Sequence, residues 1–338
     1  MKFKYIVFML VGIVSIGFAS WSKDQIRVVG SSTVYPFASA VAEELGAVTK
    51  YKTPVVESTG SGGGMKLFCK GVGKNTPDIT NASRKMKKSE FKLCQKNGVN
   101  HITEVMIGYD GIAFAQSAKN KPFSITKKQL LLAVAKEVPN KDGTKLIKNP
   151  YTNWNQIDPS LENRKIVIYG PPTSSGTRDA FEDMILKAQT KKMQVYGFKK
   201  YHKIRDDGIY IPSGENDNLI VQKLDKDREA FGIFGYSFLE ENEDKVQASL
   251  IDGIKVTPKN ISDGKYPLAR SLFFYIKNDH LKHVESLNEY IKLFISESMI
   301  GEDGELSDIG LIPLDKAQRA KIQKRVLNKE ELSEADFK

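Results

Sequence analysis

The sequence is poor in the residues on which metal sites and many hydrolases rely. Among 338 residues there are two cysteines and four histidines. His280 and His283 fit one helix face, but no carboxylate pattern beside them indicates a metal site. The chain also lacks the GxxxxGK[ST] of a nucleotide P-loop and the GxSxG of a serine-hydrolase elbow. We therefore expect no metal, no cofactor and no catalytic residue.

Long apolar runs are also absent, except at the start of the chain. Lys2 and Lys4 precede an apolar run over residues 5–18, and small residues stand at its end, at Gly17 and Ala19. A basic start, an apolar run and a small-residue pattern are typical of a secretory signal. A membrane anchor is the alternative, but a span needs roughly 20 apolar residues. We expect residues 1–20 to be a signal peptide that is cleaved on secretion to a bacterial periplasm, and no lipid anchor, since no cysteine lies near the cleavage point.

The two cysteines, Cys69 and Cys94, are compatible with two states. In an oxidising compartment they can form a disulfide that closes a loop of about 25 residues, a link typically worth ~2–4 kcal/mol. The alternative is a pair of free structural thiols. Secretion favours the disulfide, because exposed thiols oxidise there.

Positive charge is in excess but is not concentrated. The formal net charge is +10, with basic clusters at residues 84–88 and 319–325. Neither cluster forms part of a known nucleic-acid-binding module, so we interpret both as solvated helix faces and expect no nucleic-acid partner. A diffuse positive field still attracts small anions.

The chain shows no low-complexity linker and no repeat, and β-like runs alternate with amphipathic segments. That alternation predicts an α/β architecture. The predicted strands cover residues 26–29, 54–57, 105–107 with 111–115, 166–169, 230–234 and 272–276. The predicted helices cover residues 36–49, 127–135, 177–188, 216–225 and 284–294.

Three of these strand-to-helix junctions are rich in glycine, serine and threonine. The junctions are residues 30–36 (GSSTVYP), 57–64 (ESTGSGGG) and 169–177 (YGPPTSSGT). The first four N–H groups of a helix lack internal partners and lie at the positive end of the helix dipole. Glycine allows close backbone approach, and short hydroxyls add donors. One such junction is explained by helix capping alone, but three predict an anion site.

At these junctions the chain resembles the substrate-binding proteins of the bacterial phosphate ABC transporter, the PstS family. The resemblance covers nearly all of the mature chain. The motifs that carry it are residues 30–36, 60–63 (GSGG), 78–84 (DITNASR), 109–113 (YDGIA) and 174–178 (SSGTR).

The resemblance implies the type II periplasmic-binding-protein fold, with two α/β lobes, a mixed sheet in each and the ligand between them. We place one lobe at residues 25–110 plus 271–338 and the other at residues 111–270. The chain would cross between the lobes at residues 109–111 and 270–272. Glu215-Asn216 is interpreted as a helix cap with its loop, and Trp154 as a packing aromatic.

The resemblance also implies which residues hold phosphate. The first loop would contribute Ser32, Thr33 and the Val34 backbone N–H, the second Ser61 and Gly62, and the third Ser175, Gly176 and Thr177. Well-known members add an Asp directly after the A-S pair and an Arg four residues before S-G-T. Here Arg84 and Pro171 stand at those two positions.

A carboxylate that accepts the proton of phosphate rejects fully ionised sulfate. Asp110, at the predicted crossing, is the replacement that we expect for the missing Asp. Arg84, with Arg178, would supply positive charge and orient Asp110. The plainer alternatives are a turn residue for Asp110, part of a basic run for Arg84, and a surface or salt-bridge residue for Arg178.

The sequence thus predicts a monomeric, non-catalytic protein that captures inorganic phosphate by lobe closure and delivers it to an inner-membrane ABC permease. One alternative is a receptor for another tetrahedral oxyanion such as sulfate, molybdate or tungstate. Another is a secreted phosphatase with Ser61 or Ser175 as nucleophile. A structural surface protein would leave the anion loops unexplained.

Overall fold

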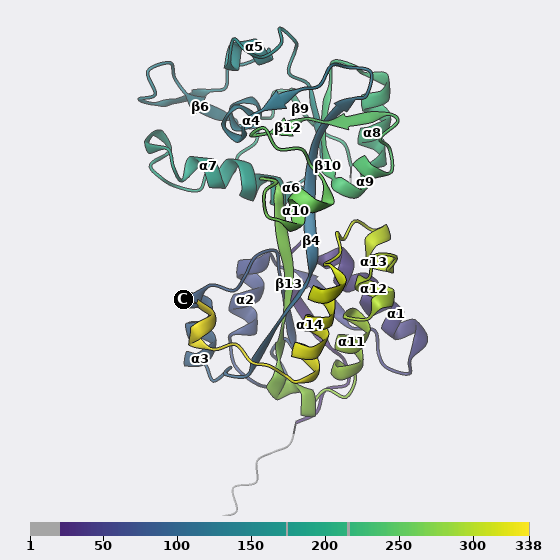
Figure 1. Cartoon of the computed structure of the whole chain (residues 1–338). Coiled ribbons are helices and arrows are strands. Elements are labelled where there is room, and N and C mark those ends of the chain that lie inside the picture. The colour runs from purple at the N-terminus through teal and green to yellow at the C-terminus, as the bar shows by residue number, and fades with distance from the viewer. Residues whose placement is uncertain (1–20, 174, 215–216, 338) are drawn as a thin grey trace, which may run out of the picture.

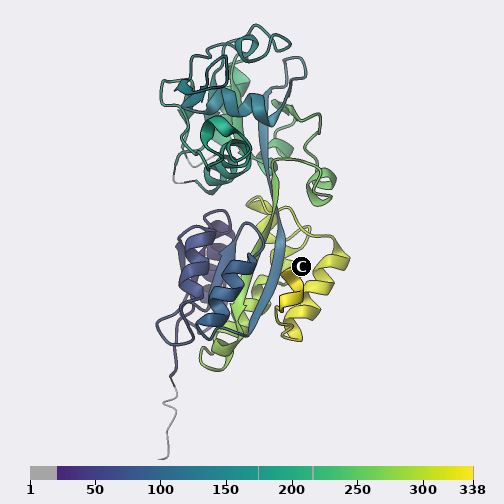
Figure 2. The same cartoon turned by 90° about the vertical axis from the view of Figure 1, so that its left-hand side faces the viewer.

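A computed structural model describes residues 21–173, 175–214 and 217–337. The chain forms two lobes that lie one above the other and are joined by two long strands, β4 (Ile102–Ser117) and β13 (Ala269–Lys277) (Figures 1 and 2). The predicted signal peptide, Ser174 and the predicted cap at Glu215-Asn216 lie outside the described residues.

The two lobes share one curled, mixed sheet of nine strands. Its order is β2-β1-β3-β13-β4-β10-β8-β9, and β11 also pairs with β4. Two small sheets, β5 with β12 and β6 with β7, complete the upper lobe of Figure 1. The other strands are β1 (Arg27–Gly30), β2 (Val55–Ser58), β3 (Ile79–Ala82), β5 (Ser124–Ile125), β6 (Glu137–Pro139), β7 (Leu146–Lys148), β8 (Ile168–Gly170), β9 (Tyr210–Pro212), β10 (Phe231–Gly235), β11 (Val246–Ala248) and β12 (Leu250–Ile251).

Helices pack around this sheet in both lobes. The lower lobe holds α1 (Tyr35–Val48), α2 (Ser61–Phe68), α3 (Lys88–Lys96), η3 (Asn278–Lys282), α11 (Leu287–Phe294), α12 (Glu297–Ile300), α13 (Glu305–Asp308), α14 (Lys316–Leu327) and η4 (Glu334–Phe337). The upper lobe holds α4 (Lys127–Val134), α5 (Trp154–Ile157), α6 (Gly176–Phe181), η1 (Glu182–Lys187), α7 (Ala188–Thr190), η2 (Gln194–Tyr196), α8 (Asn218–Lys226), α9 (Tyr236–Glu240) and α10 (Pro258–Ser262).

The predicted α/β class is confirmed, and most predicted elements lie within a few residues of the observed ones. Two elements differ. The strand predicted in two pieces is one 16-residue strand, β4. The helix predicted over 177–188 changes at Glu182 from α6 into the π-helical turn η1. Such turns often occur near functional sites.

The crossing between the lobes is an antiparallel pairing of β4 with β13. Arg270 is opposite Asp110, and Ala269 is opposite Gly111. The pairing shifts register between Leu272 and Phe273, which leaves one extra residue in β4. Because a bulge bends a strand and increases its twist, the shift suits a strand that serves two lobes.

Separate apolar cores support the predicted division into lobes. One core draws on residues 109–269, together with Ile312 and Leu314, and includes Trp154 stacked edge-on against Phe114 and Phe231. Two cores of the lower lobe lie on opposite faces of its sheet. One takes Leu272, Phe274 and Ile276 from β13, and the other takes Phe273 and Tyr275. The exact division at residues 110 and 270 stays a prediction.

The second of these lower-lobe cores contains a disulfide between Cys69 and Cys94. Cys69 is the C-cap of α2, directly after Phe68, and Cys94 lies in α3. The disulfide therefore ties together two helices whose other residues line the cleft between the lobes. Within the described part of the chain, no helix is both long and apolar enough to span a membrane.

A buried cluster of charges lies at the end of the lower sheet that is far from the upper lobe. Asp78 accepts hydrogen bonds from His280 Nδ1 and Lys23 Nζ, both at 2.6 Å, and from the Arg27 N–H at 2.7 Å. Burial alone would raise the pKa of Asp78, but these donors outweigh it and lower the pKa.

The same cluster includes Lys277, at the end of β13. Its Nζ donates to the Gly71 carbonyl at 2.7 Å and to the Thr76 hydroxyl at 3.0 Å. Burial lowers the pKa of Lys277 to about 7.

Candidate functional site

The three predicted anion loops all reach the space between the lobes. The loops precede α1, α2 and α6, so three helix N-termini lie at the junction. Each N-terminus offers unpaired N–H groups and partial positive charge. Two adjacent hollows, of about 880 Å³ and about 480 Å³, open beside these loops.

The predicted residues divide between the two hollows. Ser32 and Thr33 line both. The larger hollow takes Ser61, Gly62 and Arg84, and the smaller takes Asp110, Ser175, Gly176 and Thr177. Val34 and Arg178 are buried and line neither hollow.

The first and third loops touch directly where the hollows meet. The Thr33 hydroxyl donates to the Gly176 carbonyl at 3.3 Å, and the Ser32 hydroxyl donates to Asp179 at 2.7 Å. A Cβ on Gly176 would lie 2.7 Å from the Ser32 carbonyl oxygen. Only glycine at this position therefore lets the lobes approach so closely.

The second loop is linked to the DITNASR motif. Gly60 has φ +69°, a left-handed turn that favours glycine and positions Ser61 as the first residue of α2. The Ser61 hydroxyl accepts from the Ser83 N–H at 3.1 Å and lies 3.2 Å from the Ser83 hydroxyl. The sequence motif thus contributes a second serine to this side of the site.

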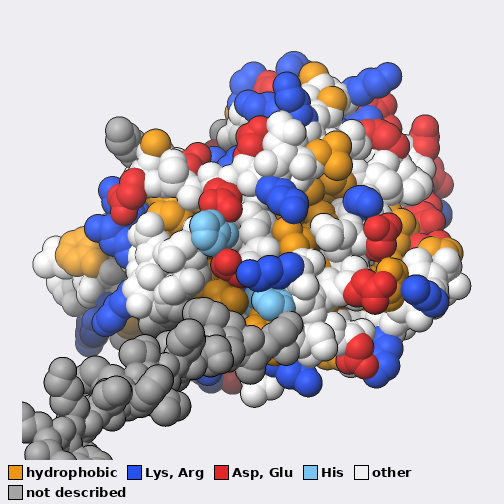
Figure 3. All heavy atoms as spheres, turned by 90° about the horizontal axis from the view of Figure 1, so that it is seen from below, with side chains coloured by type: hydrophobic (Ala, Val, Ile, Leu, Met, Phe, Trp, Pro, Cys, Tyr) orange, Lys and Arg blue, Asp and Glu red, His pale blue; other side chains and the backbone are white. Residues whose placement is uncertain are grey.

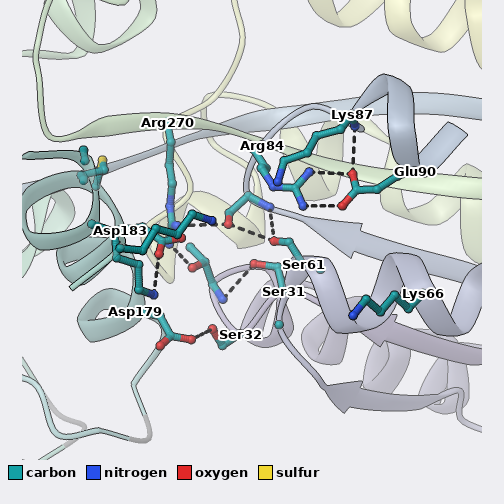
Figure 4. Close-up of a pocket in the computed structure, with 18 of the residues that line it drawn as sticks. Ser31, Ser32, Ser61, Lys66, Arg84, Lys87, Glu90, Asp179, Asp183 and Arg270 are labelled. Atoms are coloured by element: carbon teal, nitrogen blue, oxygen red, sulfur yellow. Dashed lines mark hydrogen bonds and ion pairs between the residues drawn. The ribbon is translucent and has the colours of Figure 1, made fainter. Parts of the chain in front are cut away.

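Arg270 joins these parts, although it is not among the site residues that the sequence predicts. Its guanidinium enters the larger hollow from β13 (Figure 4). Nη1 donates to the Ser83 hydroxyl at 3.0 Å, Nη2 donates to the Thr33 hydroxyl, and Nε is 3.3 Å from Asp110 Oδ2. One cation therefore contacts the first loop, the DITNASR motif and the predicted proton acceptor.

The sequence predicts a chain crossing at residues 270–272, but no motif there gives the side chain of Arg270 a role. The one feature of the sequence that could have indicated a role is that each predicted crossing segment contains a charged residue, Asp110 in the first and Arg270 in the second. Its position opposite Asp110 depends on the register of two strands that are 160 residues apart in the chain.

Arg84 lies in the larger hollow, but it does not orient Asp110 as the sequence predicted. Both of its terminal nitrogens bind Glu90, at 2.9 and 2.7 Å (Figure 4). The hydrogen bond with Glu90 is the main cause that raises the pKa of Arg84. Glu90 belongs to α3, so this helix determines where the Arg84 charge lies.

Arg178 does not orient Asp110 either. Its Nε is 2.7 Å from Glu182, its guanidinium lies 4.7 Å from the centre of the Tyr210 ring, and Nη1 donates to the Pro171 carbonyl at 3.4 Å. The side chain is buried within the upper lobe, where it ties α6 to the loop at Pro171. This geometry matches the plainer alternative for Arg178, a salt-bridge residue. The arginine that pairs with Asp110 is Arg270.

The resulting arrangement suits a tetrahedral oxyanion. Hydroxyls and helix N-termini from two lobes supply neutral donors, Arg270 supplies a positive charge, and Asp110 supplies one acceptor. Among the described residues, no histidine lines either hollow, so no serine there has a histidine base beside it.

Several known proteins are similar to this chain in sequence and in architecture. The chain is 32% identical over 319 residues to protein SphX of Synechococcus elongatus, covering 92% of this chain and 84% of SphX. It is 27% identical to the phosphate-binding protein PstS of Staphylococcus haemolyticus, covering 81% of this chain and 78% of PstS.

The crystal structure of a possible phosphate-binding protein from Planctomyces limnophilus superposes with a TM-score of 0.73 at 28% identity, covering 92% of this chain and 100% of that one. The model of the PBP superfamily domain matches residues 19–298. With most of its length matched and its two lobes joined by crossing strands, the chain belongs to the PBP superfamily.

Proposed function

We propose that this protein captures inorganic phosphate between its two lobes and delivers it to the permease of an ABC transporter. The observation that carries the proposal is the convergence of hydroxyl-rich loops from both lobes on Arg270 and Asp110. The relatives named as phosphate-binding proteins support the same ligand. The protein is a binding protein, not an enzyme.

The ligand would bind to donors of both lobes and favour their closed arrangement. Ser32, Thr33, Val34, Ser61 and Gly62 would bind from the lower lobe, and Ser175, Gly176 and Thr177 from the upper lobe. Closure of lobes about a crossing is a known hinge motion, and a ligand that binds the closed form more tightly shifts the population toward it. The closed protein would then dock on the permease as a monomer, in the periplasm, after signal-peptide cleavage.

Asp110 would give the site its preference for phosphate. Phosphate near neutral pH still carries a proton that a carboxylate accepts, whereas fully ionised sulfate has none and meets an unpaired acceptor. Arg270, in contact with Asp110, would balance the charge of the bound anion. Arg84 would add positive charge from the side of α3, and we assign Arg178 only to packing within the upper lobe.

Isothermal calorimetry with phosphate and sulfate tests the proposal. Wild-type protein should bind phosphate and reject sulfate. Asp110→Asn should lower the ratio of the two affinities by about tenfold or more, because an amide donates to the sulfate oxygens that the carboxylate repelled. Indifference of the wild type to phosphate would overturn the function. Preferential binding of sulfate, molybdate or tungstate would favour the receptor for another oxyanion.

A further inference from the structure

The larger hollow is much bigger than a single phosphate ion requires. Its volume of about 880 Å³ falls in the range of pockets that hold drug-sized molecules. The Ser/Thr loops and Arg270 occupy only one part of its lining. The rest extends outward between α2, α3 and the η1 region of the upper lobe.

Cations outnumber carboxylates in the lining of this hollow. The hollow as a whole has seven Lys or Arg side chains against three carboxylates, and no aromatic side chain among the described residues. By contrast, cations and carboxylates are interspersed on the end of the lower lobe that Figure 3 shows. The larger hollow therefore shares in the protein's overall excess of positive charge, which attracts anions.

Three of these cations form what we call the basic shelf: Arg84, Lys87 and Lys200. Arg84 follows Ser83 directly in the chain, and Figure 4 shows it on the same side of the hollow as Lys87. Lys200 belongs to the upper lobe, so the shelf spans both sides of the cleft. Glu90 offsets the charge of Arg84, but Lys87 and Lys200 form no ion pair with any described carboxylate.

The shelf cations are close enough to repel one another. The pKa of Lys87 is lowered, first by the charge of Arg84 and then by burial, and Lys200 and Lys191 add to the effect. An anion between them would remove this repulsion. The chemistry of the lining indicates what such a ligand carries beyond its first phosphate: further negative charge, not a nucleoside or other ring, for which stacking partners would be expected.

We propose that the cleft also binds linear condensed phosphates such as pyrophosphate, with a terminal phosphoryl group at the Ser/Thr loops and the next on the basic shelf. The inference rests on the proposed phosphate site, which would hold the terminal group. It extends the ligand class of that site from orthophosphate to short inorganic phosphate chains.

Calorimetry on the mature protein in metal-free buffer tests this inference with orthophosphate and pyrophosphate as probes. Wild-type protein should bind both, and each should compete with the other. Lys87→Gln combined with Lys200→Gln should weaken pyrophosphate binding by ~10-fold or more, because two charges that face the second phosphoryl group are lost. Orthophosphate binding should change by less than about threefold, since neither lysine contacts the inner site.

A matched control removes two exposed lysines far from the cleft, Lys141→Gln with Lys145→Gln in the turn between β6 and β7. It should leave both affinities unchanged. Orthophosphate binding without pyrophosphate binding would overturn this inference and leave the proposed function intact. Equal weakening of both anions by the shelf variant would also overturn it, because the shelf would then act only as a general field. Failure of both anions to bind wild-type protein would overturn the function and this inference together.

Discussion

The two ends of the β3–β13 pair carry two charge clusters with opposite properties. At the cleft end, Ser83 and Arg84 follow β3 and Arg270 lies near the start of β13. At the far end, Asp78 precedes β3 and Lys277 ends β13. The Arg270–Asp110 side chains are 11% and 13% exposed, whereas those of Asp78 and His280 are fully buried.

This difference in exposure indicates that the buried charges stabilise the fold, whereas the cleft charges are available to a ligand. At the far end each charge has protein partners on several sides, which fixes the fold and leaves nothing for a ligand. At the cleft end the partners are hydroxyls and two carboxylates, Asp110 and Glu90, beside which an incoming anion can bind. We expect substitutions at the far end to change stability and those at the cleft end to change affinity.

The largest expected effect is on stability, from Asp78→Ala. The change leaves His280 and Lys23 without their buried acceptor, and breaking a buried ion pair in this way costs about 3–5 kcal/mol. Urea unfolding should show this loss in the free energy of unfolding, while the phosphate affinity of the folded protein stays within a few-fold of wild type. Asp24→Ala, which removes an exposed partner of Lys52, is the control and should leave the free energy of unfolding nearly unchanged. Equal losses of unfolding free energy in the two variants would show that the buried cluster contributes no more to stability than an exposed ion pair.

The next effect concerns affinity and tests the cleft end. Arg270→Gln removes the guanidinium that contacts Thr33, Ser83 and Asp110, and we expect phosphate to bind about 100-fold more weakly. The free energy of unfolding should change far less than in the Asp78 variant. Arg228→Gln, at an exposed arginine outside both hollows, should bind phosphate like the wild type. If the Arg270 variant bound phosphate like the wild type but had a much lower free energy of unfolding, the cleft end would serve stability and not binding.

The smallest effect is a pH dependence at the far end. Because the folded pKa of Lys277 is about 7 and its ordinary value is 10.5, the unfolded chain binds more protons between these values. Stability should therefore rise with pH across this interval, by at most ~1.4 kcal/mol per pH unit from this group. Lys277→Met should remove that part of the slope, measured as the difference between the two proteins from pH 7 to 9. Parallel pH profiles would show that Lys277 is protonated alike in both states.

Local sequence patterns were enough to predict the class of fold and the neutral part of the site. The apolar face of residues 36–49 predicted α1 to within one residue at each end, and the glycine-serine junctions were placed correctly before α1, α2 and α6. The break of β4 into two predicted pieces came from Gly108 and Asp110, which interrupt its apolar pattern. Those residues are tolerated because β13 pairs with β4 throughout the crossing.

The charged part of the site was harder to predict, because it depends on contacts between distant segments. Arg84 and Arg178 stand in motifs beside the loops, which made them the natural candidates for charge near the ligand. Their orientation is determined by Glu90 and Glu182, four to six residues further along, and no motif marks these acids. Arg270 faces Asp110 only because of strand register, for which a single sequence gives little signal.

The Cys69–Cys94 disulfide has a consequence for how the protein is produced. It links α2, which begins at Ser61, to α3, whose Glu90 binds Arg84. The disulfide therefore limits how far these two helices, and their residues in the cleft, can move apart. Chains made in a reducing cytosol lack this disulfide until they are oxidised. Affinities measured on cytosolic and on exported material are therefore comparable only after the thiol content of each has been determined.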